Sequence, residues 1–207
     1  MASCGLAGSG QPIEIYGPPE LKDYLHACAK YSHFKLPHHI RFHPIHPGIL
    51  YEDKEFSVSC GPLKHRIPAY GYRISEKDRP GRFNVEKAKK LGIPPGPVYG
   101  ELKQGKTVTL DDGRRIRGQD LCGERETGRK VIYCTDTVFC EGAIALSEDA
   151  DVLIHEATFA HQDAQLAFER LHSTSTMGAQ VALAAQVKQL IMTHFSPRYA
   201  PGNALQL

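Results

Sequence analysis

The sequence predicts an α/β protein in which parallel strands alternate with helices and a Gly/Pro-rich segment interrupts the fold. Three observations support this prediction. After Lys130, short apolar runs alternate with helical segments, which is typical of βαβ units. Between Glu76 and Lys130, Pro and Gly are dense and apolar periodicity is weak. A chain of 207 residues is also long enough to bury a hydrophobic core without disulfide bonds.

The first third of the chain predicts strands and one helix. Ile13–Tyr16 is a short β-like run, and the prolines that follow Gly17 introduce a helix that continues to about Tyr31. Ile40–Ser59 alternates apolar and polar residues between turn signals, which predicts a β-meander. Ala69–Ile74 predicts a further strand.

The Glu76–Lys130 segment differs from the rest of the chain in charge as well as in composition. It holds 14 of the 25 Lys and Arg residues but 9 of the 23 Asp and Glu residues, a net charge of +5, which leaves 11 and 14, or −3, elsewhere. Only a short helix near Asn84–Leu91 is predicted here. Two interpretations remain open, a solvated insertion and an arm that contacts a polyanion.

The last third of the chain predicts three strands, each followed by a residue that can bind a metal or a proton. The apolar runs are Val131–Cys134, Val152–Ile154 and Leu190–Met192, and an alanine-rich helix covers Thr174–Val187. The runs are followed by Thr135-Asp136, His155-Glu156 and Thr193-His194. Parallel strands carry their sites beyond their carboxyl ends, so these three ends should share one rim.

Composition excludes several classes of protein. No apolar run approaches the 18 residues of a membrane-spanning helix, and the opening residues lack the pattern of a signal peptide. The six cysteines are scattered without a CxxC pair, which is typical of reduced thiols in a cytosolic protein. The net charge of +2 for the whole chain is not that of a histone-like nucleic-acid binder.

Histidine is unusually frequent, with eleven residues. Four residues form a candidate set for divalent metal and proton chemistry: His65, Asp136, His172 and His194. Asp136 has two oxygens and could bridge two metals about 4 Å apart. Five earlier histidines show no ligand spacing, and we expect them at the surface: His33, His38, His39, His43 and His46.

Several segments together resemble the short form of tRNase Z (ribonuclease Z), the tRNA 3′-processing endonuclease of the metallo-β-lactamase superfamily. The resemblance runs from Ile13 to Gly202, and its most diagnostic part is the Gly-Pro-rich segment Gly92–Gly100. The other segments that carry it are Leu63–Tyr72, Thr135–Thr137, His155–Thr158, His172–Thr174 and Thr193–Tyr199.

The resemblance implies an αββα sandwich of two mixed sheets with residues 76–130 as an inserted tRNA-binding arm, the exosite. Pro95, Gly96 and Pro97 would lie at the heart of this arm. The resemblance also implies zinc, with manganese as the alternative metal, and a cytoplasmic homodimer acting on precursor tRNA. His65 and His194 would each ligate one metal, Asp136 would bridge both, and His172 would protonate the leaving 3′ oxygen.

The sequence departs from the family pattern at one important point. It lacks the family's His-x-His-x-Asp-His motif, so the resemblance implies a single partial domain over residues 1–207 that begins after this motif and ends before a last helix and strand. Each metal would then have two protein ligands instead of three. We therefore expect weak metal binding and little or no nuclease activity from this chain alone, an active full-length protein, and an exposed sheet edge with apolar surface.

Two other functions remain open at this stage. One is a non-catalytic tRNA-binding module or partner subunit that keeps the arm without a competent centre. The other is a metallo-β-lactamase hydrolase of small esters, against which the Pro95–Pro97 arm argues. The roles of His155 and Glu156 are also open, between orienting His172 or a ligand and capping a strand end, and the first role is favoured for Glu156.

Overall fold

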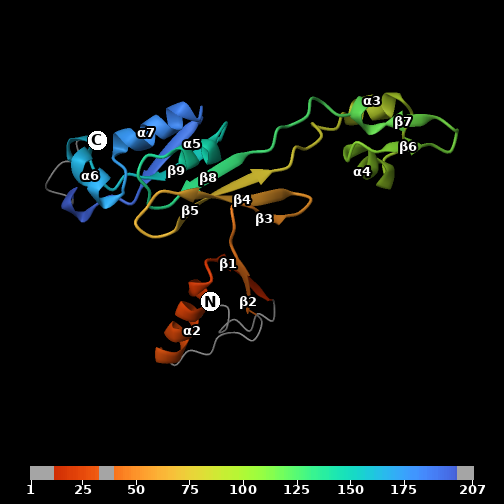
Figure 1. Ribbon diagram of the computed structural model, residues 1–207. Helices are drawn as coiled ribbons and strands as arrows, with labels where there is room; N and C mark the ends of the chain where they lie inside the picture. Colours follow the sequence, from red (N-terminus) through yellow and green to blue (C-terminus); the bar gives the residue numbers. More distant parts are fainter. Residues whose placement is uncertain (1–11, 33–39, 200–207) are drawn as a thin grey trace. The chain divides into compact units, whose positions relative to one another are not determined.

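The computed structural model describes residues 12–32 and 40–199 (Figure 1). The chain divides into two compact units. The first unit contains residues up to 53, residues 57–74 and those from 131 onward, and the second contains residues 54–56 and 75–130. In the described ranges, no helix combines the length and apolar character needed to cross a membrane.

A six-stranded mixed sheet with the strand order β10-β9-β8-β5-β4-β3 organises the first unit. Its strands are β3 (Gly48–Glu52), β4 (Phe56–Leu63), β5 (Ala69–Glu76), β8 (Lys130–Cys134), β9 (Val152–Glu156) and β10 (Gln189–Thr193). β8, β9 and β10 pair in parallel, whereas β3 and β4 form an antiparallel hairpin. The predicted strands of the last third are confirmed, as is the parallel arrangement that brings their carboxyl ends to one edge.

Helices connect these parallel strands and cover one face of the sheet (Figure 1). They are α5 (Glu141–Ser147), α6 (Ala164–Arg170) and α7 (Ser175–Ala184), with the short 3-10 helix η2 (His161–Asp163). A further 3-10 helix, η3 (Pro197–Tyr199), follows β10. The hydroxyl of Thr174 caps α7 by accepting from the Met177 N–H at 3.1 Å. α7 ends before the predicted Val187 because Gln186 adopts a positive φ of 54°.

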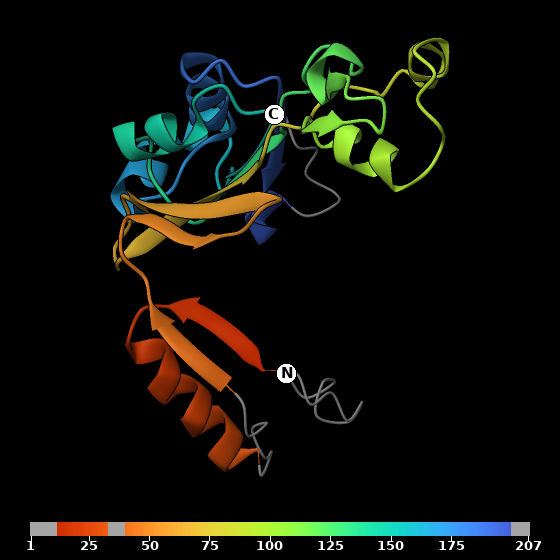
Figure 2. The same cartoon turned by 90° about the vertical axis from the view of Figure 1, so that its right-hand side faces the viewer.

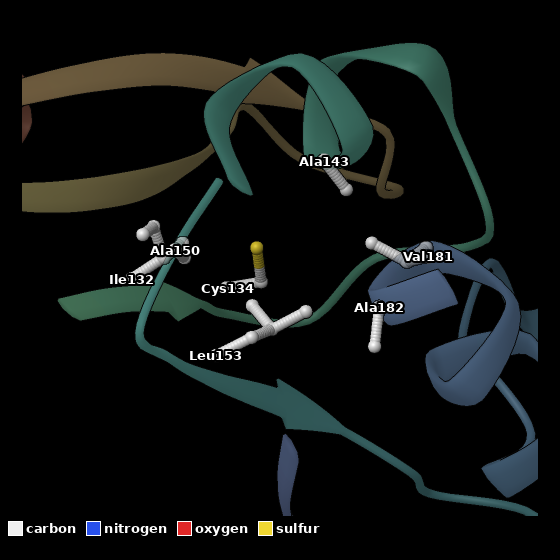
Figure 3. Packing of buried hydrophobic residues seen from close by; sticks show 7 residues of the cluster. All are labelled: Ile132, Cys134, Ala143, Ala150, Leu153, Val181 and Ala182. Atoms are coloured by element: carbon white, nitrogen blue, oxygen red, sulfur yellow. The ribbon is translucent and has the colours of Figure 1, made fainter. Parts of the chain in front are cut away.

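The core of the first unit lies between the sheet and α5 and α7 (Figure 3). Strand register places Ile132 opposite Leu153, and both side chains are fully buried. Val181 from α7 and Ala143 from α5 pack against this pair. Each large aliphatic side chain buried here contributes roughly 1.5–3 kcal/mol, so this cluster fixes the strands whose ends carry the candidate site.

The opposite face of the same three strands carries a second apolar row. Tyr133 pairs with Ile154, and Ile154 pairs with Ile191, so the three side chains lie on one face in register. Tyr133 and Ile191 each remain 45% exposed. In the residues described, β8 to β10 are therefore apolar on both faces, but only the face towards α5 and α7 is fully packed.

A separate β-α-β element opens the described chain (Figure 2). It consists of β1 (Ile13–Gly17), α2 (Glu20–Tyr31) and β2 (Ile40–Pro44), and its two strands pair in parallel from Ile13↔Ile40 to Gly17↔Pro44. The strand and the helix are confirmed. Within the β-meander predicted over Ile40–Ser59, the antiparallel pairing of β3 and β4 is confirmed, but the place of β2 in it is wrong. Alternation of apolar residues identifies a strand without identifying its partner, and β2 pairs with β1 instead of β3.

The early histidines that the structure describes have partners outside the candidate site. His43 Nε2 lies 2.5 Å from Glu14 Oε2, and its ring stacks on Tyr16 with the centroids 4.6 Å apart. The backbone carbonyl of His46 accepts from the Cys60 thiol. His33, His38 and His39 lie outside the described residues.

The second unit, residues 54–56 and 75–130, has a small core of its own. Its elements are α3 (Val85–Lys90), α4 (Pro97–Lys103), β6 (Thr107–Thr109), β7 (Arg115–Arg117) and the 3-10 helix η1 (Gly118–Asp120). The side chains at its centre are almost fully buried: Ala88, Ile93, Leu102 and Leu121. Asn84 caps the predicted short helix by accepting from Lys87 N–H at 2.8 Å, and Pro97 occupies the first turn of α4.

Ion pairs join the two chain segments at the start and end of this unit. The Arg129 guanidinium binds the Glu76 carboxylate through Nε at 2.9 Å and Nη2 at 2.5 Å. This hydrogen bonding lowers the pKa of Glu76 to about 2. Backbone hydrogen bonds between Arg79 and Glu126 extend the same ladder.

The five cysteines in the described residues are free thiols, as expected; Cys4 lies outside them.

Candidate metal centre

Two of the predicted residues meet at the carboxyl ends of the parallel strands. Asp136 follows β8, and His194 follows β10. His194 Nε2 lies 3.6 Å from Asp136 Oδ1, and both side chains are about half exposed, at 50% and 41%. The expectation of a shared rim therefore holds for these two residues, because β9 brings the ends of β8 and β10 together.

His65 and His172 come from two turns that are distant in sequence. His65 lies between β4 and β5, and His172 follows α6. His65 Nδ1 donates to the carbonyl of Leu171 at 2.8 Å, and the centroids of the His65 and His172 rings lie 4.8 Å apart. The turn at residues 171–172 therefore orients the His65 ring through its backbone and contains His172 itself.

The four predicted residues form one continuous cluster. Donor atoms of His65, Asp136 and His172 all lie within 4.8 Å of one another. The rings of His172 and His194 stack with their centroids 5.6 Å apart. Imidazole and carboxylate donors at this spacing suit zinc and similar divalent ions.

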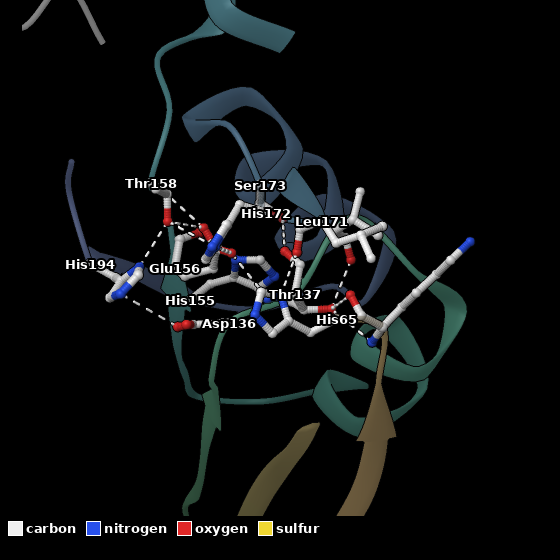
Figure 4. A network of polar contacts seen from close by, with 12 residues as sticks. His65, Asp136, Thr137, His155, Glu156, Thr158, Leu171, His172, Ser173 and His194 are labelled. Carbon is white, nitrogen blue, oxygen red and sulfur yellow. Dashed lines mark hydrogen bonds and ion pairs between the residues drawn. The ribbon is translucent and has the colours of Figure 1, made fainter. Parts of the chain in front are cut away.

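A buried carboxylate, that of Glu156, accepts hydrogen bonds from residues in and beside this cluster (Figure 4). Glu156 is 1% exposed. Its Oε1 accepts from Thr137 N–H at 3.0 Å and from His172 Nδ1 at 2.8 Å. Its Oε2 accepts from the backbone N–H of Thr158 at 2.9 Å and from the hydroxyl of Thr158 at 2.7 Å. Four donors thus compensate for the cost of burying this charge and fix the His172 ring.

Each histidine of the cluster therefore has a protein oxygen at Nδ1. The oxygens are the Leu171 carbonyl for His65, the Glu156 carboxylate for His172 and, at 2.8 Å, the Thr158 hydroxyl for His194. Histidines that bind metal commonly engage their other ring nitrogen in this way, which fixes the orientation of the ring. His65, His194 and Asp136 therefore fit divalent ions bound through Nε2 atoms and a carboxylate, and the same contact at Nδ1 leaves the Nε2 atom of His172 facing the cluster.

Thr137 braces the loops that carry the cluster. Its hydroxyl accepts from Lys64 N–H at 3.1 Å, and its carbonyl accepts from the Ser173 hydroxyl at 2.6 Å. Its backbone N–H binds Glu156. One buried threonine thus connects the residues next to His65, Asp136 and His172, so the relative positions of the three side chains depend on backbone hydrogen bonds as well as on their own contacts.

His155 departs from the expected rim. Register pairs it with Cys134, whose side chain belongs to the core between the sheet and the helices, and His155 is 0% exposed. Its Nδ1 donates to the Glu156 carbonyl at 2.7 Å, whereas its Nε2 has no partner in the described residues. Burial lowers the pKa of His155, so the ring is held neutral and away from the metal cluster.

A cavity of about 450 Å³ adjoins the cluster. His65, His172 and Phe159 form part of its wall, and its charged lining residues are Arg66, Glu169, Arg170 and Arg198. The guanidinium of Arg198 lies over the Phe159 ring, 5.2 Å from its centroid. Three guanidinium groups beside the imidazoles favour an anionic ligand in this cavity.

The chain was compared with known proteins. It is 94% identical over all 207 residues to a ribonuclease Z of Crocosphaera subtropica and 78% identical to a ribonuclease Z of Rippkaea orientalis. The chain belongs to the ribonuclease Z family. It spans 66% of the length of each of these two relatives. Residues 109–195 also match the beta-lactamase superfamily domain.

Solved structures confirm the metallo-β-lactamase fold of this chain. Human tRNase Z, short form, aligns with a TM-score of 0.62 and 28% identity, covering 95% of this chain and 66% of that chain. A long form RNase Z from yeast aligns with a TM-score of 0.57 at 16% identity, covering 93% of this chain and 25% of that chain, which supports the fold alone.

Sequence reasoning missed three groups of this candidate centre. They are the Leu171 carbonyl, the Ser173 hydroxyl and the Thr158 hydroxyl. A backbone carbonyl has no signature in a sequence, and serine and threonine are too common to stand out singly. Only the position of Thr158, two residues after Glu156 at the end of a strand, offered a signal.

Proposed function

We propose that this chain forms the greater part of a zinc-dependent tRNA 3′-processing endonuclease that removes the 3′ trailer from precursor tRNA. The observation that supports it most directly is the cluster of His65, Asp136, His172 and His194 around a buried carboxylate, in a chain 94% identical to a ribonuclease Z. Zinc, or manganese in its place, would be held by His65 on one side and His194 on the other, with Asp136 between them. When bound, these ions supply a nucleophile from water and neutralise charge on the phosphate.

His172 is the proposed proton donor. Its Nδ1 is engaged by Glu156 at 2.8 Å, which leaves Nε2 to hold the proton that the leaving 3′ oxygen receives. The carboxylate fixes the ring and stabilises its positive charge while Nε2 carries that proton. The 17% exposure of the His172 side chain gives substrate access and restricts competing water.

The cavity beside His172 is proposed to receive the RNA backbone around the cut. Arg66, Arg170 and Arg198 line it, and guanidinium groups bind phosphate oxygens through paired hydrogen bonds. The net charge of +5 over residues 76–130 supports their proposed role as the tRNA-binding arm, with Pro95, Gly96 and Pro97 at its centre. We also propose a cytoplasmic homodimer, as the resemblance to the ribonuclease Z family implies, and light scattering after size-exclusion chromatography would test the dimer.

The test is cleavage of a 3′-extended precursor tRNA by this chain and by the chain extended to the length of its relatives, each with and without zinc. We expect efficient, zinc-dependent cleavage by the longer protein. We expect little cleavage by the chain alone, because it supplies only two of the proposed ligands to each ion. In the longer protein, His172→Ala should lower turnover by about 10²- to 10⁴-fold and leave tRNA binding intact.

One outcome would contradict the proposed activity, and another would contradict the expectation that the 207-residue chain alone is nearly inactive. Binding of tRNA without cleavage by the longer protein, at any metal concentration, would favour the non-catalytic binding module. Stoichiometric zinc and efficient cleavage by the 207-residue chain would show that its own residues complete the centre.

A further inference from the structure

Thr158 holds a central position between the two histidines nearest to Glu156. Its side chain is buried at 8% exposure, in the loop that follows β9. Its hydroxyl oxygen lies 2.7 Å from Glu156 Oε2, 2.8 Å from His194 Nδ1 and 3.2 Å from His172 Nδ1. A hydroxyl has one proton, so Thr158 can donate in only one of these three contacts and must accept in the others.

The Glu156 carboxylate decides which contact receives this proton. A carboxylate only accepts, and a hydrogen bond to a buried charge is worth roughly 1.5–3 kcal/mol, against about 1 kcal/mol for a neutral pair. If the hydroxyl pointed elsewhere, two oxygen lone pairs would face each other at 2.7 Å. The hydroxyl of Thr158 therefore donates to Glu156 and must accept from any other partner.

This assignment fixes the proton of His194. Because Thr158 accepts, the hydrogen bond at 2.8 Å requires a proton on His194 Nδ1. The neutral ring then carries its lone pair on Nε2, which lies 3.6 Å from Asp136 Oδ1. His172 Nδ1 has its own acceptor in Glu156 Oε1 at 2.8 Å, so its contact with Thr158 at 3.2 Å is the weaker branch.

We propose that Thr158 is a positioning residue that selects the Nδ1–H tautomer of His194 and so aims the Nε2 lone pair of this ring at the metal cluster. One buried carboxylate then controls both imidazoles, His172 directly and His194 through the threonine hydroxyl. The inference deepens the proposed function, since it concerns the same centre, but the proton positions that it assigns exist in the chain whether or not RNA is cut.

Threonine suits this role better than other small residues. Its backbone N–H also donates to Glu156 Oε2, at 2.9 Å, so the residue is anchored to the carboxylate twice. The β-branch restricts rotation about χ1 and holds the hydroxyl in place. Valine has the same shape without the hydroxyl, and serine keeps the hydroxyl without the methyl group, so the two substitutions separate packing from hydrogen bonding.

The direct test is long-range ¹H–¹⁵N NMR of the histidine rings in the metal-free 207-residue chain, at a pH well above the usual range of imidazole titration. We expect His194 in the Nδ1–H form in the unsubstituted chain and in Thr158→Ser. In Thr158→Val we expect a shift towards the Nε2–H form that predominates for a free histidine side chain. An Nε2–H form of His194 in the unsubstituted chain would overturn the proposal without requiring any variant to fold.

Zinc titration calorimetry gives a second readout. Thr158→Val should weaken zinc binding by about 10- to 100-fold, the usual effect of removing the partner that orients a metal-binding histidine. Thr158→Ser should remain close to the unsubstituted chain. Equal losses in the two variants would assign the effect to packing and contradict the proposal.

Thr174→Val is the matched control. Thr174 is also a buried threonine near the centre, but its hydroxyl caps α7 by accepting from Met177 N–H. Its substitution should lower stability and leave the His194 tautomer unchanged. A chain that passes these tests and yet fails to cleave precursor tRNA in its longer form would refute the proposed function and leave the assignment of Thr158 in place.

Discussion

The metal centre and the 75–130 unit use charged residues in opposite ways. In the centre, Glu156 is buried and all four of its hydrogen bonds come from residues of other loops or from its own turn. In the 75–130 unit, charged pairs such as Glu86–Lys89 and Arg117–Asp120 are exposed and only three residues apart. A buried charge fixes geometry because each lost partner is costly, whereas an exposed pair contributes little to stability and leaves its charge available to a ligand.

The buried charge of the centre and the exposed charges of the 75–130 unit suit two different requirements of the proposed function. Proton transfer and metal binding need atoms held to within a fraction of an ångström. Attraction of a polyanion needs net positive charge, and it tolerates side chains that move. In the proposed function, a few buried groups would meet the first need, and the surplus of Lys and Arg on a small, locally folded unit would meet the second.

The sharpest way to break this comparison is to remove one glutamate from each region. Glu156→Ala would leave two buried N–H groups, the buried Thr158 hydroxyl and the His172 ring without their acceptor, and should lower the free energy of unfolding by about 4 kcal/mol. Glu86→Ala, the matched change in the 75–130 unit, should have no measurable effect. Urea denaturation followed by circular dichroism measures both. Similar losses in the two variants would contradict the contrast.

A change in the small core tests whether the 75–130 unit is stable by itself. Leu102 is fully buried, and Leu102→Ala should cost about 3 kcal/mol within that unit. Hydrogen exchange should then show lost protection in α4 and β6, while β8 and β9 remain protected. Loss of protection in β9 as well would show that the two units unfold together.

Buried His155 gives the first unit a pH dependence close to neutrality. Burial lowers the pKa of His155, so the unfolded chain binds this proton first as the pH falls. This contribution to stability is complete above about pH 6.5 and is lost as the pH falls towards the lowered pKa, at no more than about 1.4 kcal/mol per pH unit. Urea midpoints measured from pH 7.5 downward should decline in the unsubstituted chain and decline less in His155→Asn. An equal slope in both would exclude His155 as the source.

The smallest expected effect is at the base of the 75–130 unit. Arg129 holds the pKa of Glu76 at about 2, so the pair stabilises the folded chain at neutral pH and loses its contribution as the pH falls from 4.5 towards 2. The effect on stability should be slight because the pair is exposed. A carbon-detected NMR titration should nevertheless place the Glu76 midpoint near 2, and Arg129→Gln should move it towards 4.5. An unchanged midpoint in the variant would exclude Arg129 as the cause.

Sequence reasoning recovered what local patterns encode. Apolar runs identified β8, β9 and β10, and their polar ends led to Asp136 and His194. The partner of β2 was wrong because pairing is decided by tertiary packing, which alternation does not record. His155 was misplaced for a related reason, since its place on the core face depends on period-2 alternation with Leu153 and not on its position near a strand end.

The connections within the centre were beyond prediction for a different reason. The contact between His65 and the Leu171 carbonyl joins residues 106 positions apart through a backbone atom that every residue possesses. The hydroxyl of Thr158 acts only because Glu156 and His194 meet around it. Such contacts follow from the folded arrangement, so a sequence can name the reacting residues before it can name the groups that aim them.

Two residues of the centre adopt left-handed backbone angles without being glycine: Leu171, with a φ of 56°, and His194, with a φ of 61°. Each costs the fold roughly 1–2 kcal/mol relative to an ordinary conformation. Leu171 forms the turn that holds His65, and His194 leaves β10 towards Asp136. An engineer who searched this chain for thermostabilising glycine substitutions would choose position 171 early. Glycine there would relieve the backbone cost, and it would also remove the stiff turn that keeps His65 in place.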